Sequence, residues 1–401
     1  MRIAVVGPAD PREFIADLHN PSGAPAGLGG TPVNSLVRSL LDLGHEVALF
    51  TASPSVRERW TAQGPLLRVS VVPYRLRART RALDFFSAER AALKSELKSF
   101  DADVYHAHWT YEFALACLDA GSTPLLVTAH DAPLTVLKRM PDPYRLVRTI
   151  MAVAVRSRIN ELTAVTPYLA DRWRTEMLYR RPIRVVTNPT PDMGSRSDMP
   201  PSDLVILDVA NGSRLKNVRR LVRAFSTVLK RVPKAELRLV GPGLERGASL
   251  HRWAARQGLD TNVHFLGTLP RDALAREYSR ASMFCHPSRE ESQGIALLEA
   301  IQFELPIIAG KKSGAVSWTL FDGEAGVLVD VRRTAAIADA IVSVHSNPSL
   351  SKARTIRAKS LAAARYSPAS VANAYVGEYE RLVAGDRKHR QAQLPGGEAP
   401  A

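Results

Sequence analysis

Pro287-Ser-Arg-Glu-Glu-Ser-Gln-Gly-Ile-Ala-Leu-Leu-Glu-Ala300 is the stretch of sequence that decides the fold. It follows a short apolar run, residues 283–286, which is typical of a buried strand. The polar loop after this strand predicts a helix that begins near Gly294. Four backbone N–H groups are then free at the start of the helix, those of Ser292, Gln293, Gly294 and Ile295. Such a helix start favours anions or hydroxyl-rich ligands.

Two carboxylates lie in this stretch, eight positions apart. Glu291 is on the loop and Glu299 is on the helix, so both can face one cleft if the helix starts near Ser292. An ionised carboxylate only accepts hydrogen bonds, which suits the hydroxyl groups of a sugar or a ribose. The alternative interpretation is a helix with an acidic first turn and a solvated glutamate.

The same alternation of strand and helix continues in both directions and predicts parallel α/β layers. The 401 residues exceed twice the roughly 150 of an average domain, so two doubly wound, Rossmann-like domains are expected. Strands are predicted at 2–7, 46–51, 68–73, 103–107, 124–129, 162–166, 183–187, 204–210, 236–240, 263–266, 283–286, 305–309 and 327–329. The predicted parts are an N-terminal domain at 1–190, a Pro-rich linker at 191–202, a second domain at 203–348, helices at 349–385 and a disordered tail at 386–401.

The Glu291 to Glu299 spacing resembles the E-x7-E motif of retaining glycosyltransferases of family 4, the glycosyl transferases group 1, which have the GT-B fold. Other segments resemble family motifs in the same order along the chain: Leu239-Val-Gly241-Pro-Gly, Val263-His-Phe-Leu-Gly267 and Asp322-Gly323-Glu-Ala-Gly326-Val-Leu-Val. The resemblance implies two domains facing a cleft, with C-terminal helices packing back toward the N-terminal domain. It also implies that the N-terminal domain binds the acceptor and the second domain binds the nucleotide-sugar donor.

The resemblance places the phosphate-binding residues in the second domain, in Asn211-Gly-Ser-Arg214-Leu-Lys216. Lys216 matches the family's lysine before a helix, where an ammonium group offsets the charge of the leaving diphosphate. The family's arginine is missing, because Asn211 stands in its place, and Arg214 is the candidate to replace it. A solvated basic helix start is the alternative for Arg214. Leu266 and Gly267 are further candidates for contacts with the donor.

Three candidates lie in the N-terminal domain. Gly29 and Gly30 open the first long helix, where glycines let the backbone approach a diphosphate, although a flexible loop is the alternative. His130 ends a predicted strand, where ligands of parallel sheets bind, and the resemblance places it at the donor sugar. Of the two histidines in the strand before it, His108 is the candidate to face the cleft on the acceptor side. A structural histidine at a strand end is the alternative.

The predicted function is therefore transfer of a hexose from a UDP- or GDP-sugar to a hydroxyl acceptor with retention of configuration. His130, Glu291 and Lys216 are the predicted catalytic residues, and the resemblance implies neither a metal nor another cofactor. The expected acceptor is a lipid-linked, cell-envelope or exopolysaccharide glycan. A nucleotide-sugar 2-epimerase and a non-enzymatic nucleic-acid-binding protein are the alternatives.

The formal charge of +15 is the unusual feature of the composition. It suggests nucleic acid first, but the basic residues lack interleaved aromatic residues, so no nucleic acid is expected as a partner. Arginines at 75, 77, 79 and 81 and in the segment 172–181 suggest peripheral contact with an anionic membrane. Solvated arginine-rich faces that bind no partner are the alternative. The two cysteines and the lack of a long apolar run predict a cytoplasmic protein, and the peripheral contact would place it at the inner face of the membrane.

Overall fold

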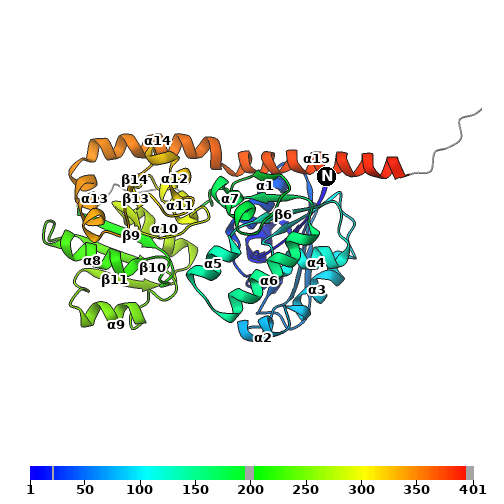
Figure 1. The fold of residues 1–401 in the computed structure, drawn as a ribbon, viewed down its shortest axis with the longest axis horizontal. Helices are drawn as coiled ribbons and strands as arrows, with labels where there is room; N and C mark the ends of the chain where they lie inside the picture. The colour runs from blue at the N-terminus through cyan, green and yellow to red at the C-terminus, as the bar shows by residue number, and fades with distance from the viewer. Residues whose placement is uncertain (20–21, 195–202, 394–401) are drawn as a thin grey trace, which may run out of the picture. The chain divides into compact units, whose positions relative to one another are not determined.

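The computed structural model describes residues 1–19, 22–194 and 203–393, with only the backbone of 387–393 (Figure 1). The chain forms two compact units. The N-terminal unit contains residues 1–189 together with the last helix, which begins at Pro368, and the C-terminal unit contains Thr190–Ser367. Each unit is built around its own sheet.

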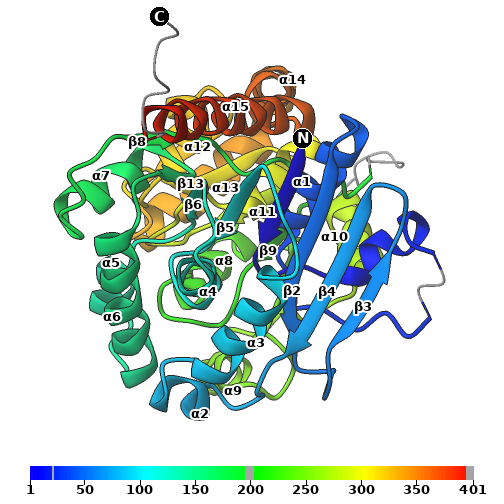
Figure 2. The ribbon, with the colours of Figure 1, turned by 90° about the vertical axis from the view of Figure 1, so that its right-hand side faces the viewer.

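The N-terminal unit has an eight-stranded sheet in the order β3-β4-β2-β1-β5-β6-β7-β8. Its strands are β1 (Arg2–Val6), β2 (Glu46–Ser53), β3 (Trp60–Gln63), β4 (Leu67–Pro73), β5 (Val104–His108), β6 (Leu125–Ala129), β7 (Leu162–Ala164) and β8 (Ile183–Val185). Seven of these were predicted and are confirmed. The sequence missed β3, a short edge strand that pairs antiparallel with β4 (Figure 2). None of its four residues is buried, so its sequence lacks the apolar pattern by which a strand is recognised.

Alternate side chains of each central strand serve two cores in the N-terminal unit. In β1, Ile3 and Val5 pack into one core, and Ala4 and Val6 pack into the other. Both faces of a parallel sheet are covered by its crossover helices, so a continuous apolar strand is required. The helical segments are η1 (Pro11–Asp17), α1 (Thr31–Asp42), α2 (Ala78–Leu83), α3 (Ser87–Leu97), α4 (Glu112–Ala120), α5 (Pro133–Arg139), α6 (Pro143–Arg158), α7 (Pro167–Thr175) and α15 (Pro368–Gln393).

The C-terminal unit has a six-stranded, fully parallel sheet in the order β11-β10-β9-β12-β13-β14. Its strands are β9 (Val205–Val209), β10 (Glu236–Val240), β11 (Val263–Gly267), β12 (Met283–His286), β13 (Ile307–Gly310) and β14 (Val327–Val329). Its helical segments are α8 (Val218–Leu229), α9 (Ser249–Arg256), α10 (Arg271–Arg280), α11 (Ile295–Gln302), α12 (Val316–Thr319), η2 (Phe321–Gly323), α13 (Thr334–Ser346) and α14 (Pro348–Tyr366). Two doubly wound parallel α/β domains are thereby confirmed.

The end of the chain differs from the prediction. The tail expected from Asp386 is helical as far as Gln393, because 386–393 contain no glycine or proline and several good helix formers. Residues 394–401, and 195–202 of the expected linker, lie outside the described residues. The two C-terminal helices separate, since α14 belongs to the C-terminal unit and α15 to the N-terminal unit.

Two further observations concern classes of protein that the composition raised. Among the described residues, no helix combines the length and the apolar character that a bilayer span needs. The two cysteines, Cys117 and Cys285, are buried and unpaired.

Candidate functional site

The carboxyl ends of β9, β10 and β11 meet through closely packed backbone. Gly241 donates its backbone N–H to the carbonyl of Gly267 at 2.8 Å, and Gly212 donates to Pro242 at 2.8 Å. A Cβ atom on Gly241 would lie 1.9 Å from the carbonyl oxygen of Ala210, and the φ of Gly241 is 132°. Only glycine fits there. Leu266 and Gly267 end β11 at this edge.

The start of α8 is anchored to the same edge by one asparagine side chain. Asn217 is buried and has a φ of 59°, and its amide donates to the carbonyls of Pro287 at 3.1 Å and Val331 at 3.0 Å. This anchor holds the preceding residue, Lys216, beside the loop that follows β12. The ammonium group of Lys216 lies 2.5 Å from Oε1 of Glu291.

Lys216 is the end of a chain of four charged side chains, which we call the charge chain: Asp208, His286, Glu291 and Lys216. Nδ1 of His286 lies 2.9 Å from Oδ1 of Asp208, and Nε2 lies 2.8 Å from Oε1 of Glu291. Asp208 and His286 are at most 1% exposed, and Glu291 is 9% exposed. The histidine therefore contacts a carboxylate with each ring nitrogen. Asp208 and His286 were not among the predicted site residues.

These contacts set the protonation states. Burial alone lowers the pKa of His286, but hydrogen bonds to Asp208 and Glu291 outweigh burial and raise it to about 9. Burial raises the pKa of Glu291, but Lys216 and His286 outweigh burial and hold it well below its usual range. At neutral pH His286 is therefore protonated and Glu291 is ionised. Such pairing is what makes buried charges tolerable.

Glu299 lies apart from the charge chain. Its Oε2 accepts a hydrogen bond from the hydroxyl of Tyr278 at 2.6 Å. Burial raises the pKa of Glu299, while Tyr278 and Arg271 oppose that rise. Neither Glu291 nor Glu299 is an exposed side chain, so the interpretation of a solvated glutamate does not describe either of them.

Two hydrogen bonds from neighbouring elements fix the backbone of the loop between Glu291 and α11. The carbonyl of Glu291 accepts from the N–H of Ala315 at 2.9 Å, and the carbonyl of Gln293 accepts from the hydroxyl of Thr319 at 2.8 Å. Gly294 caps α11 with a φ of 86°, so the helix begins at Ile295 and not near Ser292. Within the described part of the chain, no side chain makes a capping hydrogen bond to this helix.

The residues that stand at the family's missing arginine are on the surface. Asn211 and Arg214 are both exposed. The side chain of Asn211 accepts a hydrogen bond from the N–H of Ser213 at 3.1 Å, which shapes the turn before α8. Arg214 therefore extends from the loop that Asn211 shapes, two residues before Lys216.

In the N-terminal unit, His108 and His130 form a pair. Nδ1 of His108 lies 2.9 Å from Nε2 of His130, and the ring of Trp109 stacks on His130 at 4.1 Å. Burial lowers the pKa of His130 to about 3 and that of His108 well below its usual range. Both are neutral imidazoles at pH 7. Among the described residues, Nε2 of His108 has no hydrogen-bond partner.

His106 shares the strand face with His108, since their rings lie 4.1 Å apart. Its two nitrogens lie 2.7 Å from the hydroxyls of Tyr379 on α15 and Thr128 on β6. The spacing of two residues puts both side chains on one face of β5. His108 contacts the strand-end histidine His130, while His106 joins the last helix to the sheet. The acceptor-side role of His108 stays a prediction.

The glycine loop precedes α1. Gly29 and Gly30 both have a φ of 84°. A Cβ on Gly30 would lie 1.8 Å from the carbonyl oxygen of Pro8, whereas a Cβ on Gly29 meets nothing within 4 Å. Gly30 also caps α1, and its carbonyl accepts hydrogen bonds from the N–H groups of Val33 at 2.8 Å and Asn34 at 3.0 Å. The loop thus brings backbone close to the end of β1, while these two N–H groups are engaged within the helix.

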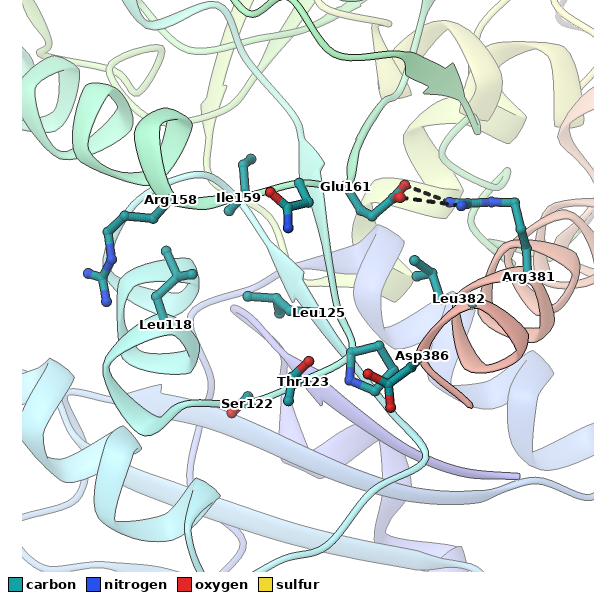
Figure 3. A pocket seen from close by; sticks show the side chains of 13 residues that line it. Leu118, Ser122, Thr123, Leu125, Arg158, Ile159, Glu161, Arg381, Leu382 and Asp386 are labelled. Carbon is teal, nitrogen blue, oxygen red and sulfur yellow. Dashed lines mark hydrogen bonds and ion pairs between the residues drawn. The ribbon is translucent and has the colours of Figure 1, made fainter. Parts of the chain in front are cut away.

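A cavity of about 320 Å³ lies elsewhere in the N-terminal unit, beside the amino ends of β6 and β7 (Figure 3). The Glu161–Arg381 ion pair, at 2.6 Å, borders it. Asp101 and Asp103, an Asp-x-Asp pair, line a neighbouring cavity at the same amino edge. Ligands of open parallel sheets bind at the carboxyl ends of strands, and neither cavity includes a predicted site residue. No three potential metal ligands gather in the described part of the chain.

Comparison with known protein families shows to which family the chain belongs. Residues 30–192 match the family described as Glycosyltransferase Family 4, and residues 195–361 match Glycosyl transferases group 1. The chain is a family 4 glycosyltransferase. This family 4 enzyme is 28% identical over 371 residues to a D-inositol 3-phosphate glycosyltransferase of Kribbella flavida, covering 82% of this chain and 85% of the relative. A protein of the same name from Corynebacterium kroppenstedtii is 26% identical over 86% of this chain and 82% of that protein.

Solved structures show the same GT-B fold as this glycosyltransferase. Sucrose-phosphate synthase of Thermosynechococcus elongatus has a TM-score of 0.74 at 19% identity, covering 96% of this chain and all (100%) of that one. Anabaena HepE, solved in complex with UDP and glucose, has a TM-score of 0.69 at 16% identity, covering 95% of this chain and 100% of that one. At these identities the likeness concerns the fold alone.

Proposed function

We propose that the enzyme transfers a hexose from a nucleoside diphosphate sugar to a hydroxyl acceptor, with retention of anomeric configuration and without a metal ion. The charge chain is the observation that carries this proposal. It places an ammonium group and a carboxylate together at the carboxyl edge of the C-terminal sheet, on elements fixed by Asn217 and by the loop 288–294. The ammonium group suits the diphosphate, and the carboxylate suits the hydroxyl groups of the sugar.

Lys216 stabilises the leaving diphosphate. The transition state develops positive charge on the sugar ring and negative charge on the departing phosphate, and a preorganised cation is worth about 3 kcal/mol against the latter. Before the donor binds, Glu291 holds the ammonium group in place at 2.5 Å. Arg214, exposed on the same loop, supplies a second cation to the phosphates.

Glu291 binds the sugar hydroxyls, because its pKa is held low and it remains a pure acceptor. His286 keeps its position when Lys216 turns to the phosphates, since the histidine stays bound to Asp208. Glu299 accepts from the ribose hydroxyls, and the N–H groups from Gln293 to Ile295 orient the donor. Leu266 and Gly267 complete the donor contacts.

In the N-terminal unit, we assign His130 to the transferred sugar and Gly29 and Gly30 to the diphosphate. His130 is neutral, so it exchanges a hydrogen bond with a sugar hydroxyl without adding a positive charge near the cationic transition state. His108 is the acceptor-side residue and holds His130 through Nδ1. The leaving phosphate receives the proton of the acceptor.

The comparisons supply the substrate classes to test. HepE was solved with UDP and glucose, which supports a UDP-sugar as donor before a GDP-sugar. The sequence relatives are named for D-inositol 3-phosphate, which supports a phosphorylated polyol as acceptor beside the expected lipid-linked or envelope glycan. Family membership favours transfer over epimerisation, and over nucleic-acid binding.

The test is turnover of UDP- and GDP-sugars with D-inositol 3-phosphate or a lipid-linked glycan as acceptor. We expect product from the wild type and at least a hundredfold lower kcat for Glu291→Ala and Lys216→Ala, since each loses about 3 kcal/mol of transition-state stabilisation. Lys230→Ala, at the other end of α8, is the matched control and keeps wild-type turnover. Unchanged turnover in Glu291→Ala, Lys216→Ala and His130→Ala would overturn the site, and an epimer as the product would overturn the reaction.

A further inference from the structure

The outward side of α6 is apolar. Leu146, Ile150 and Val153 are 50%, 46% and 46% exposed. Their spacing of four and three residues puts them on one face of the helix. The opposite face, with Met151 and Val155, is already buried in the unit. The exposed face therefore contributes little to the core, although it carries the side chains that a core would use.

More exposed apolar residues lie at the start of α6. Leu76, Leu83 and Phe85 are 79%, 74% and 40% exposed, on the segment that contains α2. The ring of Phe86 lies 6.1 Å from that of Tyr144 in the first turn of α6, so this segment adjoins the beginning of the helix.

Another exposed apolar residue lies beside the end of α6. Leu178 is 56% exposed, and its carbonyl accepts from the guanidinium of Arg156 at 2.9 Å. Arg181 donates to the carbonyl of Ile159 at 3.0 Å. In Figure 2, α7, α6 and α2 lie along one side of the N-terminal unit. We call the exposed apolar side chains of α6 and of these two adjoining segments the α6 surface: Leu76, Leu83, Phe85, Leu146, Ile150, Val153 and Leu178.

Two of the arginines that were expected to bind a membrane contact other residues of the protein instead. Arg75 pairs with Glu89 at 2.6 Å and Asp84 at 2.8 Å. Arg81 is 8% exposed and lies over the ring of Tyr74 at 4.3 Å. These two arginines hold the α2 segment in place and are not available to lipid, which corrects the expectation from sequence.

The charge around the α6 surface is nevertheless positive. Arg77 and Arg79 are exposed at one end, and Arg180 and Arg181 are exposed at the other. Three of the four arginines of the helix pair with acidic residues of neighbouring segments: Arg145 with Asp142, Arg148 with Glu112 and Arg158 with Asp119. The exposed arginines at the two ends therefore provide the positive charge. Two copies of such a face would oppose arginine to arginine, because a twofold interface pairs a patch with itself. An anionic partner fits this charge better than a second copy does.

We propose that the α6 surface binds the anionic face of a lipid bilayer. The apolar side chains of α6 enter the headgroup region, and the exposed arginines at both ends contact lipid phosphates. An amphipathic helix with an apolar face and basic flanks is the kind that lies in the membrane interface. This binding is independent of the sugar donor, so it can hold or fail without the proposed reaction.

The test is cosedimentation of the full chain with vesicles of phosphatidylcholine alone or of phosphatidylcholine mixed with phosphatidylglycerol. The wild type should bind the mixed vesicles at least tenfold better, and salt should weaken the binding. The triple variant Leu146→Ser, Ile150→Ser, Val153→Ser should lose at least tenfold of that binding. Leu350→Ser with Ile356→Ser, equally exposed on α14, is the matched control and should bind as the wild type does.

A second pair isolates the charge. Arg77→Gln with Arg79→Gln should weaken binding severalfold, whereas Lys230→Gln with Lys234→Gln on the C-terminal unit should leave it unchanged. Equal binding to both vesicles, wild-type binding by the triple variant, or no binding by the wild type would overturn the proposal. So would a dimer in solution that the triple variant abolishes, since the surface then pairs two copies. An unchanged melting temperature shows that the variants are folded.

Discussion

Replacement of His286 by glutamine tests the charge chain most directly. The rise in the pKa of His286 from the ordinary 6.5 to about 9 is worth about 3 kcal/mol of stability, since one pH unit corresponds to about 1.4 kcal/mol. Because the pKa is raised in the folded state, this stabilisation is fully present below pH 6.5 and is lost as the pH rises through 9. Glutamine keeps a hydrogen-bond donor but carries no charge.

The assay is thermal unfolding of the full chain between pH 6 and pH 10. For a unit of this size, about 1 kcal/mol shifts the melting temperature by roughly 2–4 °C. The gap between wild type and His286→Gln should therefore shrink by about 6–12 °C from pH 6.5 to above pH 9. His345→Gln, at an exposed position on α13, is the control and should follow the wild type. Parallel curves for wild type and His286→Gln at every pH would refute a charged histidine between the two carboxylates.

Two other predictions concern the N-terminal unit. Gly30→Ala should lower the free energy of unfolding by about 3 kcal/mol or more, because its Cβ would lie 1.8 Å from the Pro8 carbonyl oxygen. Gly29→Ala should lower it by only about 1–2 kcal/mol, which is the cost of the positive φ. Equal losses for the two variants in urea unfolding would contradict the close approach of Gly30 to Pro8. Tyr379→Phe should cost about 1–3 kcal/mol by leaving a nitrogen of His106 buried without a partner, and a urea midpoint equal to that of the wild type would show that the hydroxyl does not satisfy this histidine.

Most of the fold was predictable because parallel strands buried on both faces are continuously apolar. Strands β1 and β2 stand out for that reason, since all of their residues after the first are buried. The edge strand Trp60–Gln63 does not, since it is exposed and its pairing depends on the neighbouring strand β4. The helix at 386–393 was missed for a related reason, because a charged helical sequence and a charged tail look alike without a partner.

Only those residues of the candidate site that belong to a sequence motif could be predicted. Glu291 and Lys216 stand in recognisable contexts, but their contact at 2.5 Å links residues 75 positions apart in sequence. Asp208 and His286 lie inside apolar strands, and a lone aspartate or histidine there has no local signature. One signal was available: both are polar residues at or near the ends of β9 and β12, which are neighbours in the sheet.

The membership of α15 in the N-terminal unit has a consequence for how the chain matures on the ribosome. Val371, Ala372, Tyr375 and Tyr379 belong to a core whose other members come largely from the first third of the sequence. Those four are synthesised after all of the C-terminal unit, Thr190–Ser367. The N-terminal unit must therefore wait, with part of its sheet uncovered and His106 lacking its tyrosine, until the whole C-terminal unit has emerged. A nascent chain stalled before Pro368 holds every predicted site residue, yet it lacks the helix that closes its first unit.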